Sequence, residues 1–75
     1  MKKPIVSGRQ TIKALTKAGF TIVRQKGSHV RLEKRGEEKT IKVTVPLHKE
    51  LKKGTLNIIL FHAEISLEEF KKLLS

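Results

Sequence analysis

Residues 20–34 read FTIVRQKGSHVRLEK, and this stretch carries the clearest structural signal in the chain. Residues 20–25 are rich in β-branched and aromatic side chains, which favour a strand. From His29 to Lys34 apolar and polar residues alternate, as they do along a strand with one buried face. Lys26-Gly27-Ser28 separates the two segments and is typical of a turn. We therefore expect an antiparallel pair of strands.

A third alternating segment follows at residues 40–45, where Ile41, Val43 and Val45 fall on one face. Pro46 should end this strand, because proline has no N–H to donate to a ladder. Together the three segments predict an antiparallel sheet that is apolar on one side. The other side should present His29, Arg31, Thr40, Lys42 and Thr44.

Helices are predicted on both sides of the strand segments in sequence. Ser7 and Gln10 are spaced as a capping box, and Gly19 is typical of the residue that ends a helix. A second helix is expected from about Gly54 to Ala63, and a short third helix should start at Ser66. The buried stripe of the second helix should contain Leu56, Ile59, Leu60 and Ala63. The expected fold is α+β in the order α-β-β-β-α, with the sheet packed on helices and a short C-terminal helix, in one domain spanning residues 1–75.

The charge balance predicts a polyanionic partner. Seventeen Lys and Arg residues stand against seven Asp and Glu, which gives a formal net charge of +10. Such a chain attracts nucleic acid through counterion release, and an acidic protein could compete for the same surface. A membrane surface fits less well, because no predicted helix is both strongly basic and strongly apolar. The lack of cysteine and of long apolar runs fits a cytoplasmic protein.

The aromatic residues argue against recognition by base stacking. The chain has three Phe and no Tyr or Trp, and Phe20, Phe61 and Phe70 all occupy core-like positions in the pattern. Many single-strand binders stack bases on aromatic side chains of a sheet, and the polar face predicted here has none. We therefore expect low base specificity. DNA binding fits less well, since no helix-turn-helix is apparent.

His29 is the residue on which chemistry is predicted. Histidine exchanges protons near neutral pH, and Lys26 and Arg31 place positive charge around this one. Beside an RNA phosphate it could act as general base on the 2′-hydroxyl. That reaction requires no metal or other cofactor, and the histidines and acidic residues lack the spacing of metal ligands. A lone strand histidine is more often merely solvated, so the alternative is a basic RNA-binding domain without chemistry.

Neighbouring residues are candidates for supporting roles. Lys26 could stabilise charge on the phosphorane, Ser28 could donate to a phosphate oxygen, and His48 could protonate the leaving oxygen. Gly27 should supply either a positive φ or close backbone approach. Ordinary turn chemistry would also explain Lys26, Gly27 and Ser28, and a loop histidine such as His48 is often structural. The predicted RNA contacts are Arg24, Lys26, Gly27, Ser28, Arg31 and Lys42.

Several short motifs, in order, carry a resemblance to a known family. They are VSG at residues 6–8, LTKAGF at 15–20, RQKGSH at 24–29, VTVPLH at 43–48 and LKKGTL at 51–56. Together they resemble the HicA family of small toxins, found in HicA–HicB toxin–antitoxin modules. The resemblance implies a double-stranded-RNA-binding-like fold, metal-independent mRNA cleavage, and catalysis by the histidine of the Gly-Ser-His motif, here His29. It also implies a HicB-like antitoxin as the protein partner.

Two positions near the end of the second predicted helix depart from the family pattern. Many members carry glycine just before the Ile-Ser pair, where this chain has Glu64. The pair Phe61-His62 stands where more polar residues are common. Both departures lie on the side of the second helix, so the expectation for His29 is unchanged.

Overall fold

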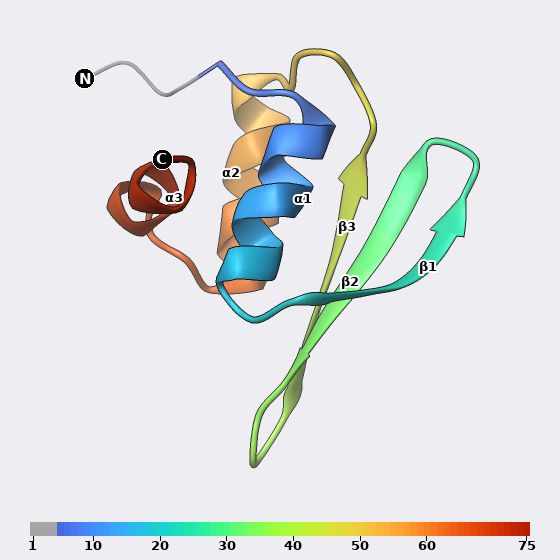
Figure 1. Ribbon diagram of the computed structural model, residues 1–75, viewed down its shortest axis with the longest axis vertical. Coiled ribbons are helices and arrows are strands. Elements are labelled where there is room, and N and C mark those ends of the chain that lie inside the picture. The colour runs from blue at the N-terminus through green and yellow to red at the C-terminus, as the bar shows by residue number, and fades with distance from the viewer. Residues whose placement is uncertain (1–4) are drawn as a thin grey trace.

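The sheet is a three-stranded antiparallel meander. A computed structural model describes residues 5–75, and the charged segment 1–4 lies outside the described residues. Strands β1 (Thr21–Lys26), β2 (His29–Arg35) and β3 (Thr40–Pro46) are hydrogen-bonded in the order β1-β2-β3 (Figure 1). Each strand lies within one residue of the predicted bounds. In β2 and β3 the alternation and the flanking turn residues agree, whereas β1, whose six residues are all exposed, follows its β-branched composition and the turn at Gly27.

Three helices gather on one side of the sheet (Figure 1). They are α1 (Gly8–Lys17), α2 (Lys53–Ala63) and α3 (Leu67–Leu73). The order helix, three antiparallel strands, two helices confirms the predicted α+β fold. Its topology is consistent with a double-stranded-RNA-binding-like domain that carries an added C-terminal helix. In residues 5–75, no helix combines the length and the apolar character that crossing a membrane would require.

The ends of α1 form as the sequence predicts. The Gln10 backbone N–H donates to Ser7 Oγ at 3.0 Å, and the Ser7 N–H donates to Gln10 Oε1 at 2.9 Å, so the capping box is complete. Gly19 takes a φ of +104°, and the Phe20 N–H then donates to the Leu15 carbonyl at 3.0 Å. This left-handed turn returns the chain from the helix into β1.

The far end of α2 closes in the left-handed region as well. Glu64 has a φ of 59°, and its own N–H and that of Ile65 donate to carbonyls of the last helical turn. Glycine is the residue that adopts this conformation most easily. Glu64 therefore occupies a position at the helix end where glycine would be favoured. Its carboxylate also pairs with the Lys39 ammonium at 2.7 Å.

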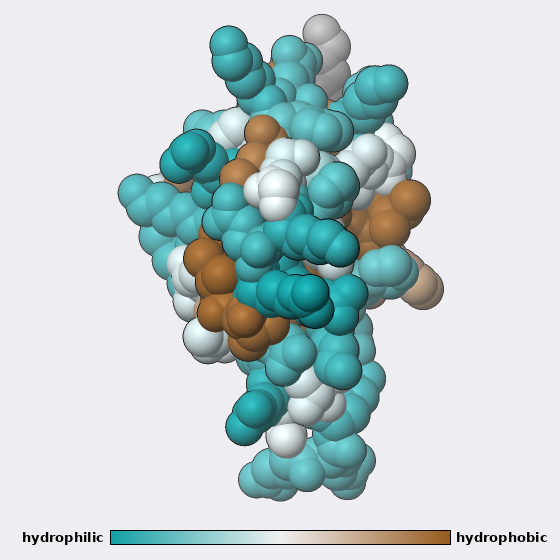
Figure 2. Space-filling model, turned by 90° about the vertical axis from the view of Figure 1, so that its right-hand side faces the viewer, coloured by the Kyte–Doolittle hydropathy of each residue, from teal (hydrophilic) through white to brown (hydrophobic). Residues whose placement is uncertain are grey.

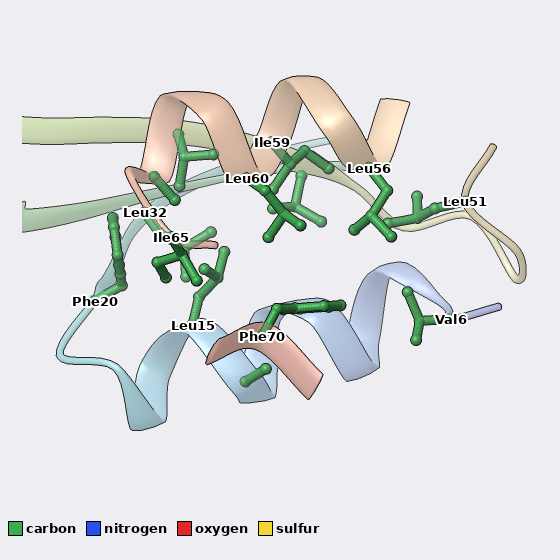
Figure 3. Close-up of a cluster of buried hydrophobic side chains, with 14 of the residues drawn as sticks. Val6, Leu15, Phe20, Leu32, Leu51, Leu56, Ile59, Leu60, Ile65 and Phe70 are labelled. Atoms are coloured by element: carbon green, nitrogen blue, oxygen red, sulfur yellow. The ribbon is translucent and has the colours of Figure 1, made fainter. Parts of the chain in front are cut away.

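The core lies between the inner face of the sheet and the three helices. Leu56 and Leu60 of α2 point toward α1, while Phe70 brings α3 against the same core (Figure 3). The predicted stripe of α2 is confirmed, since all four of its residues are buried. The buried hydrophobic set is Val6, Ala14, Leu15, Phe20, Val30, Leu32, Val43, Val45, Leu51, Leu56, Ile59, Leu60, Ala63, Ile65 and Phe70.

The expectation that all three phenylalanines lie in the core is wrong for Phe61. Phe20 and Phe70 are buried, whereas Phe61 is 79% exposed. Leu60 already occupies the inner side of α2, and the next residue is turned about 100° around the helix axis, away from the core. The fold therefore leaves one large aromatic side chain on the surface.

Candidate functional site

A hollow on the outer face of the sheet surrounds His29. It has a volume of about 280 Å³ and is lined by Arg24, Lys26, His29, Arg31 and Thr44. All five residues are exposed, so the hollow is open to solvent. The side of the molecule facing away from α1 and α3 is mostly hydrophilic, with separate apolar patches (Figure 2). The predicted polar face of the sheet is confirmed.

The strand register brings these side chains together. Lys26 pairs with His29, Arg24 pairs with Arg31, and Arg31 pairs in turn with Thr44 on β3. Side chains directly opposite each other in an antiparallel pair start only about 5 Å apart. Three adjacent strands therefore contribute to one small area around the β1–β2 turn.

A β-bulge puts the β1 cations on the same face as His29. The β1–β2 register shifts between Ile22 and Arg24, which leaves Val23 as an extra residue. Beyond a bulge the alternation of a strand is displaced by one residue. Thr21 lies opposite Glu33 on the outer face. If the register continued from there without the shift, Val23 would lie opposite Arg31, and Gln25 would lie opposite His29. Sequence reasoning missed this bulge, because Val23 is an ordinary strand residue.

The positive charges around the hollow suit it to bind an anion. Three of its five residues are cationic and none is acidic. The nearest acidic position on this face is Glu33, which pairs with Thr21 on one side and with Lys42 on the other. Within residues 5–75 one salt bridge forms, between Lys39 and Glu64, and none of the cations that line the hollow takes part in it. An anion such as a phosphate would offset the repulsion among them.

The β1–β2 turn is built by Gly27 and Ser28. Gly27 has a φ of +59°, so of the two reasons predicted for this glycine the positive φ is confirmed. The Gln25 side-chain amide donates to the Gly27 carbonyl at 3.2 Å and steadies the turn. Ser28 is exposed but does not line the hollow, and its carbonyl accepts a hydrogen bond from the Leu47 N–H at 2.7 Å.

His48 lies at the same end of the sheet without lining the hollow. It follows Pro46, which pairs with His29, by two residues, and its side chain is exposed. The His48 carbonyl accepts from the Gly8 N–H at 2.9 Å. A Cβ on Gly8 would overlap the Pro46 carbonyl oxygen, so glycine lets the start of α1 approach the end of β3 closely. This contact fixes the segment that carries His48.

A second hollow adjoins the first and reaches from the sheet to α2. It is lined by Arg31, Lys42, Val43, Thr44, Ile58 and His62. Arg31 and Thr44 border both hollows, whereas Lys42 borders the second alone. His62, predicted to lie on the side of the second helix, thus borders the same hollow as Arg31 and Lys42. Thr44 was predicted on the same face as Arg31 but not as a site residue, and it lines both hollows.

The described part of the chain gathers no group of three or more His, Cys, Asp or Glu side chains that could hold a metal ion. The residues brought together are cations, one histidine and hydroxyl groups. They suit the binding of an anion and the transfer of a proton beside it.

A family model described as the HicA toxin of bacterial toxin–antitoxin systems matches residues 8–65. The chain belongs to the HicA family. The match covers most of the chain, from the start of α1 to the residue that follows Glu64, and includes every residue of both hollows. A search among curated proteins gave no match. This HicA chain is accordingly the toxin of a toxin–antitoxin system, a class known for RNA-cleaving toxins.

Proposed function

We propose that this HicA toxin is a metal-independent endoribonuclease, an mRNA interferase, in which His29 is the catalytic residue. The observation that carries the proposal is the hollow in which His29 stands among Arg24, Lys26 and Arg31 with no acidic residue lining it. A phosphate bound to those cations would hold the adjacent ribose within reach of an exposed imidazole. Membership of the HicA family supports the same chemistry.

The reaction begins with proton transfer. A ring nitrogen of His29 removes the proton of the RNA 2′-hydroxyl, and the resulting oxygen attacks the neighbouring phosphorus in line. The bond from phosphorus to the 5′-oxygen then breaks, and that oxygen takes up a proton. The products are a 2′,3′-cyclic phosphate and a 5′-hydroxyl. No step needs a metal ion or another cofactor.

The neighbours of His29 supply charge and protons. Lys26 is its direct cross-strand partner and is our candidate for stabilising the phosphorane. Ser28 is proposed to donate to a phosphate oxygen from the turn. His48 is the candidate acid for the leaving oxygen, because its segment is fixed beside the strand end that pairs with His29.

RNA is proposed to bind by its backbone. Arg24, Lys26, Arg31 and the turn residues Gly27 and Ser28 contact the phosphates around the cut, and Lys42 extends the contact into the second hollow. Neither hollow offers a Phe, Tyr or Trp for stacking, so base specificity should be low. In the cytoplasm, this cleavage would inhibit translation until a HicB-like antitoxin of the type II kind covers the toxin.

The alternative is a basic RNA-binding domain in which His29 is one more polar contact. Incubation of RNA with the purified toxin in EDTA separates the two functions. We expect the wild type to shorten the RNA and His29→Ala to leave it intact, while Thr40→Ala at the far end of the same face stays active. Equal cleavage by wild type and His29→Ala, or no cleavage by the wild type without Mg²⁺, would contradict the proposal.

The same variants must keep the fold for this comparison to hold. His29 is exposed, so its replacement removes little packing, and we expect an unchanged thermal midpoint and unchanged RNA affinity. Loss of cleavage together with intact folding and binding would assign His29 to the chemical step.

A further inference from the structure

The outer side of α2 carries two large apolar side chains although it faces solvent. Residues 54–63 carry no charged side chain, in a chain where 32% of residues are charged. Ile58 is 58% exposed and Phe61 is 79% exposed. They stand three residues apart on the helix, so they form one continuous surface, which we call the α2 patch. Asn57 and His62 are exposed beside the patch, so its apolar part consists of Ile58 and Phe61. Two adjoining large apolar side chains that are both exposed are typical of a surface that another molecule covers.

Positive charge borders this patch. Ile58 and His62 line the second hollow together with Arg31 and Lys42, so the patch continues directly into the basic face of the sheet. The Phe61 ring lies beside that of His62, with centroids 5.9 Å apart. Lys53 is exposed at the start of the helix, and Glu64 at its end is paired with Lys39. A partner that fits this surface is apolar at its centre and acidic at its rim.

We propose that the α2 patch is a docking surface for the antitoxin protein. An apolar side chain of the antitoxin packs on Ile58 and Phe61, and adjoining carboxylates face Arg31 and Lys42. The proposal rests on the proposed function, because it takes an antitoxin as the natural partner. It extends the contact from the His29 hollow, across the second hollow that RNA is proposed to enter at Lys42, to Phe61 on the outer side of α2.

Charge favours this occupant over a second copy of the toxin. A symmetric contact through the α2 patch would bring Arg31 and Lys42 of one molecule near the same cations of the other. Each molecule has a net charge of +10, so that contact would be repulsive. RNA fits less well, since Ile58 offers neither an aromatic face for stacking nor a donor to a phosphate, and Phe61 could contact RNA only by stacking a single base. Large exposed aromatic side chains are instead frequent anchors of protein interfaces.

The test compares two equally exposed apolar residues. Phe61→Ser removes the centre of the patch, and Ile5→Ser is the matched control, because Ile5 is 76% exposed and lies between α1 and α3, away from the patch. The probe is the protein encoded next to the toxin gene, and its affinity is measured by titration calorimetry. We expect Phe61→Ser to weaken binding by about tenfold or more, and Ile5→Ser to bind like the wild type.

A second measurement keeps this result separate from the proposed function. RNA cleavage in EDTA should be the same for Phe61→Ser, Ile5→Ser and wild type. Unchanged antitoxin affinity in Phe61→Ser would overturn the docking site, whatever the outcome of the cleavage assay. Loss of RNA affinity in Phe61→Ser would make the patch an RNA surface. A wild-type dimer that becomes monomeric in Phe61→Ser would make it a self-contact, and either finding would also overturn the proposal.

Discussion

Arg24 of β1 lies directly opposite Arg31 of β2 on the outer face of the sheet. Like charges in this position destabilise a strand pair, and a cross-strand pair is typically worth about 0.2–1 kcal/mol. Both side chains line the hollow around His29, where no acidic residue offsets them. The free protein therefore carries a local repulsion that a bound phosphate would relieve.

Replacing one of these arginines should raise stability and lower RNA affinity together. Arg24→Gln removes the repulsion, so the free energy of unfolding should rise by about 0.2–1 kcal/mol, and by less at high salt. Affinity for RNA should fall, because one phosphate contact is lost. Denaturant unfolding and RNA titration on the same variant measure the two effects.

Arg35→Gln is the control for this trade-off. Arg35 is also an exposed β2 residue, but Thr40 is its partner on β3 and it lies outside the His29 hollow. It should show neither the gain in stability nor the specific loss in affinity. A decrease in stability for Arg24→Gln would mean that the arginine pair is already compensated in the free protein.

RNA binding should depend steeply on salt. On single strands, log K falls against log salt with a slope of about −0.7 for each phosphate neutralised. Lys26 borders the His29 hollow, so Lys26→Gln should make the slope shallower by about 0.7. Lys72→Gln, on α3 at the opposite side of the molecule, should leave the slope unchanged. Equal changes of the slope in the two variants would show that RNA binding depends on the net charge of the protein and not on the cations of the His29 hollow.

The strand pattern predicted more of this molecule than the helix pattern did. Period-2 alternation predicted β2 and β3 and their outer face, because each of these two strands has one buried and one solvated side. All six residues of β1 are exposed, and its β-branched composition alone indicated a strand. On α2 the same reasoning was weaker, since apolar residues lie nearly all round the helix. Phe61 was therefore assigned to the core, although Leu60 already occupies that side.

The composition of the site was predicted in part. Four of the candidates, Arg24, Lys26, His29 and Arg31, meet in one hollow, while Ser28, His48 and Lys42 lie around it. The bulge at Val23 had no sequence signal, because a bulge depends on the register with the neighbouring strand. The approach of His62 to Lys42 depends on how α2 packs beside β3, which no local pattern contains.

Two glycine substitutions should have opposite effects on stability. Gly8→Ala would put a Cβ into the Pro46 carbonyl oxygen, so unfolding should become easier by about 1–3 kcal/mol. Gly54→Ala meets no atom within 4 Å and lies in the first turn of α2, so it should stabilise by up to about 1 kcal/mol. Thermal or urea unfolding measures both. A neutral Gly8→Ala would mean that α1 can move away from the end of β3 at no cost.

Gly8→Ala should also lower the rate of RNA cleavage if His48 is the acid of the reaction. The Gly8 N–H donates to the His48 carbonyl, so displacing α1 displaces that histidine. If His48 is the acid, His48→Ala and Gly8→Ala should both lower kcat while RNA affinity is maintained. A kcat unaffected by His48→Ala would remove His48 from the reaction and leave the proton to solvent.

The central claim is that His29 activates the RNA 2′-hydroxyl, and the ends of the products test it most directly. RNA cut by the wild type in EDTA is analysed by mass spectrometry beside a DNA of the same sequence and beside RNA treated with His29→Ala. The predicted result is fragments with 2′,3′-cyclic phosphate and 5′-hydroxyl ends from RNA, with intact DNA and no fragments from His29→Ala. Fragments that carry 5′-phosphate and 3′-hydroxyl ends would contradict it.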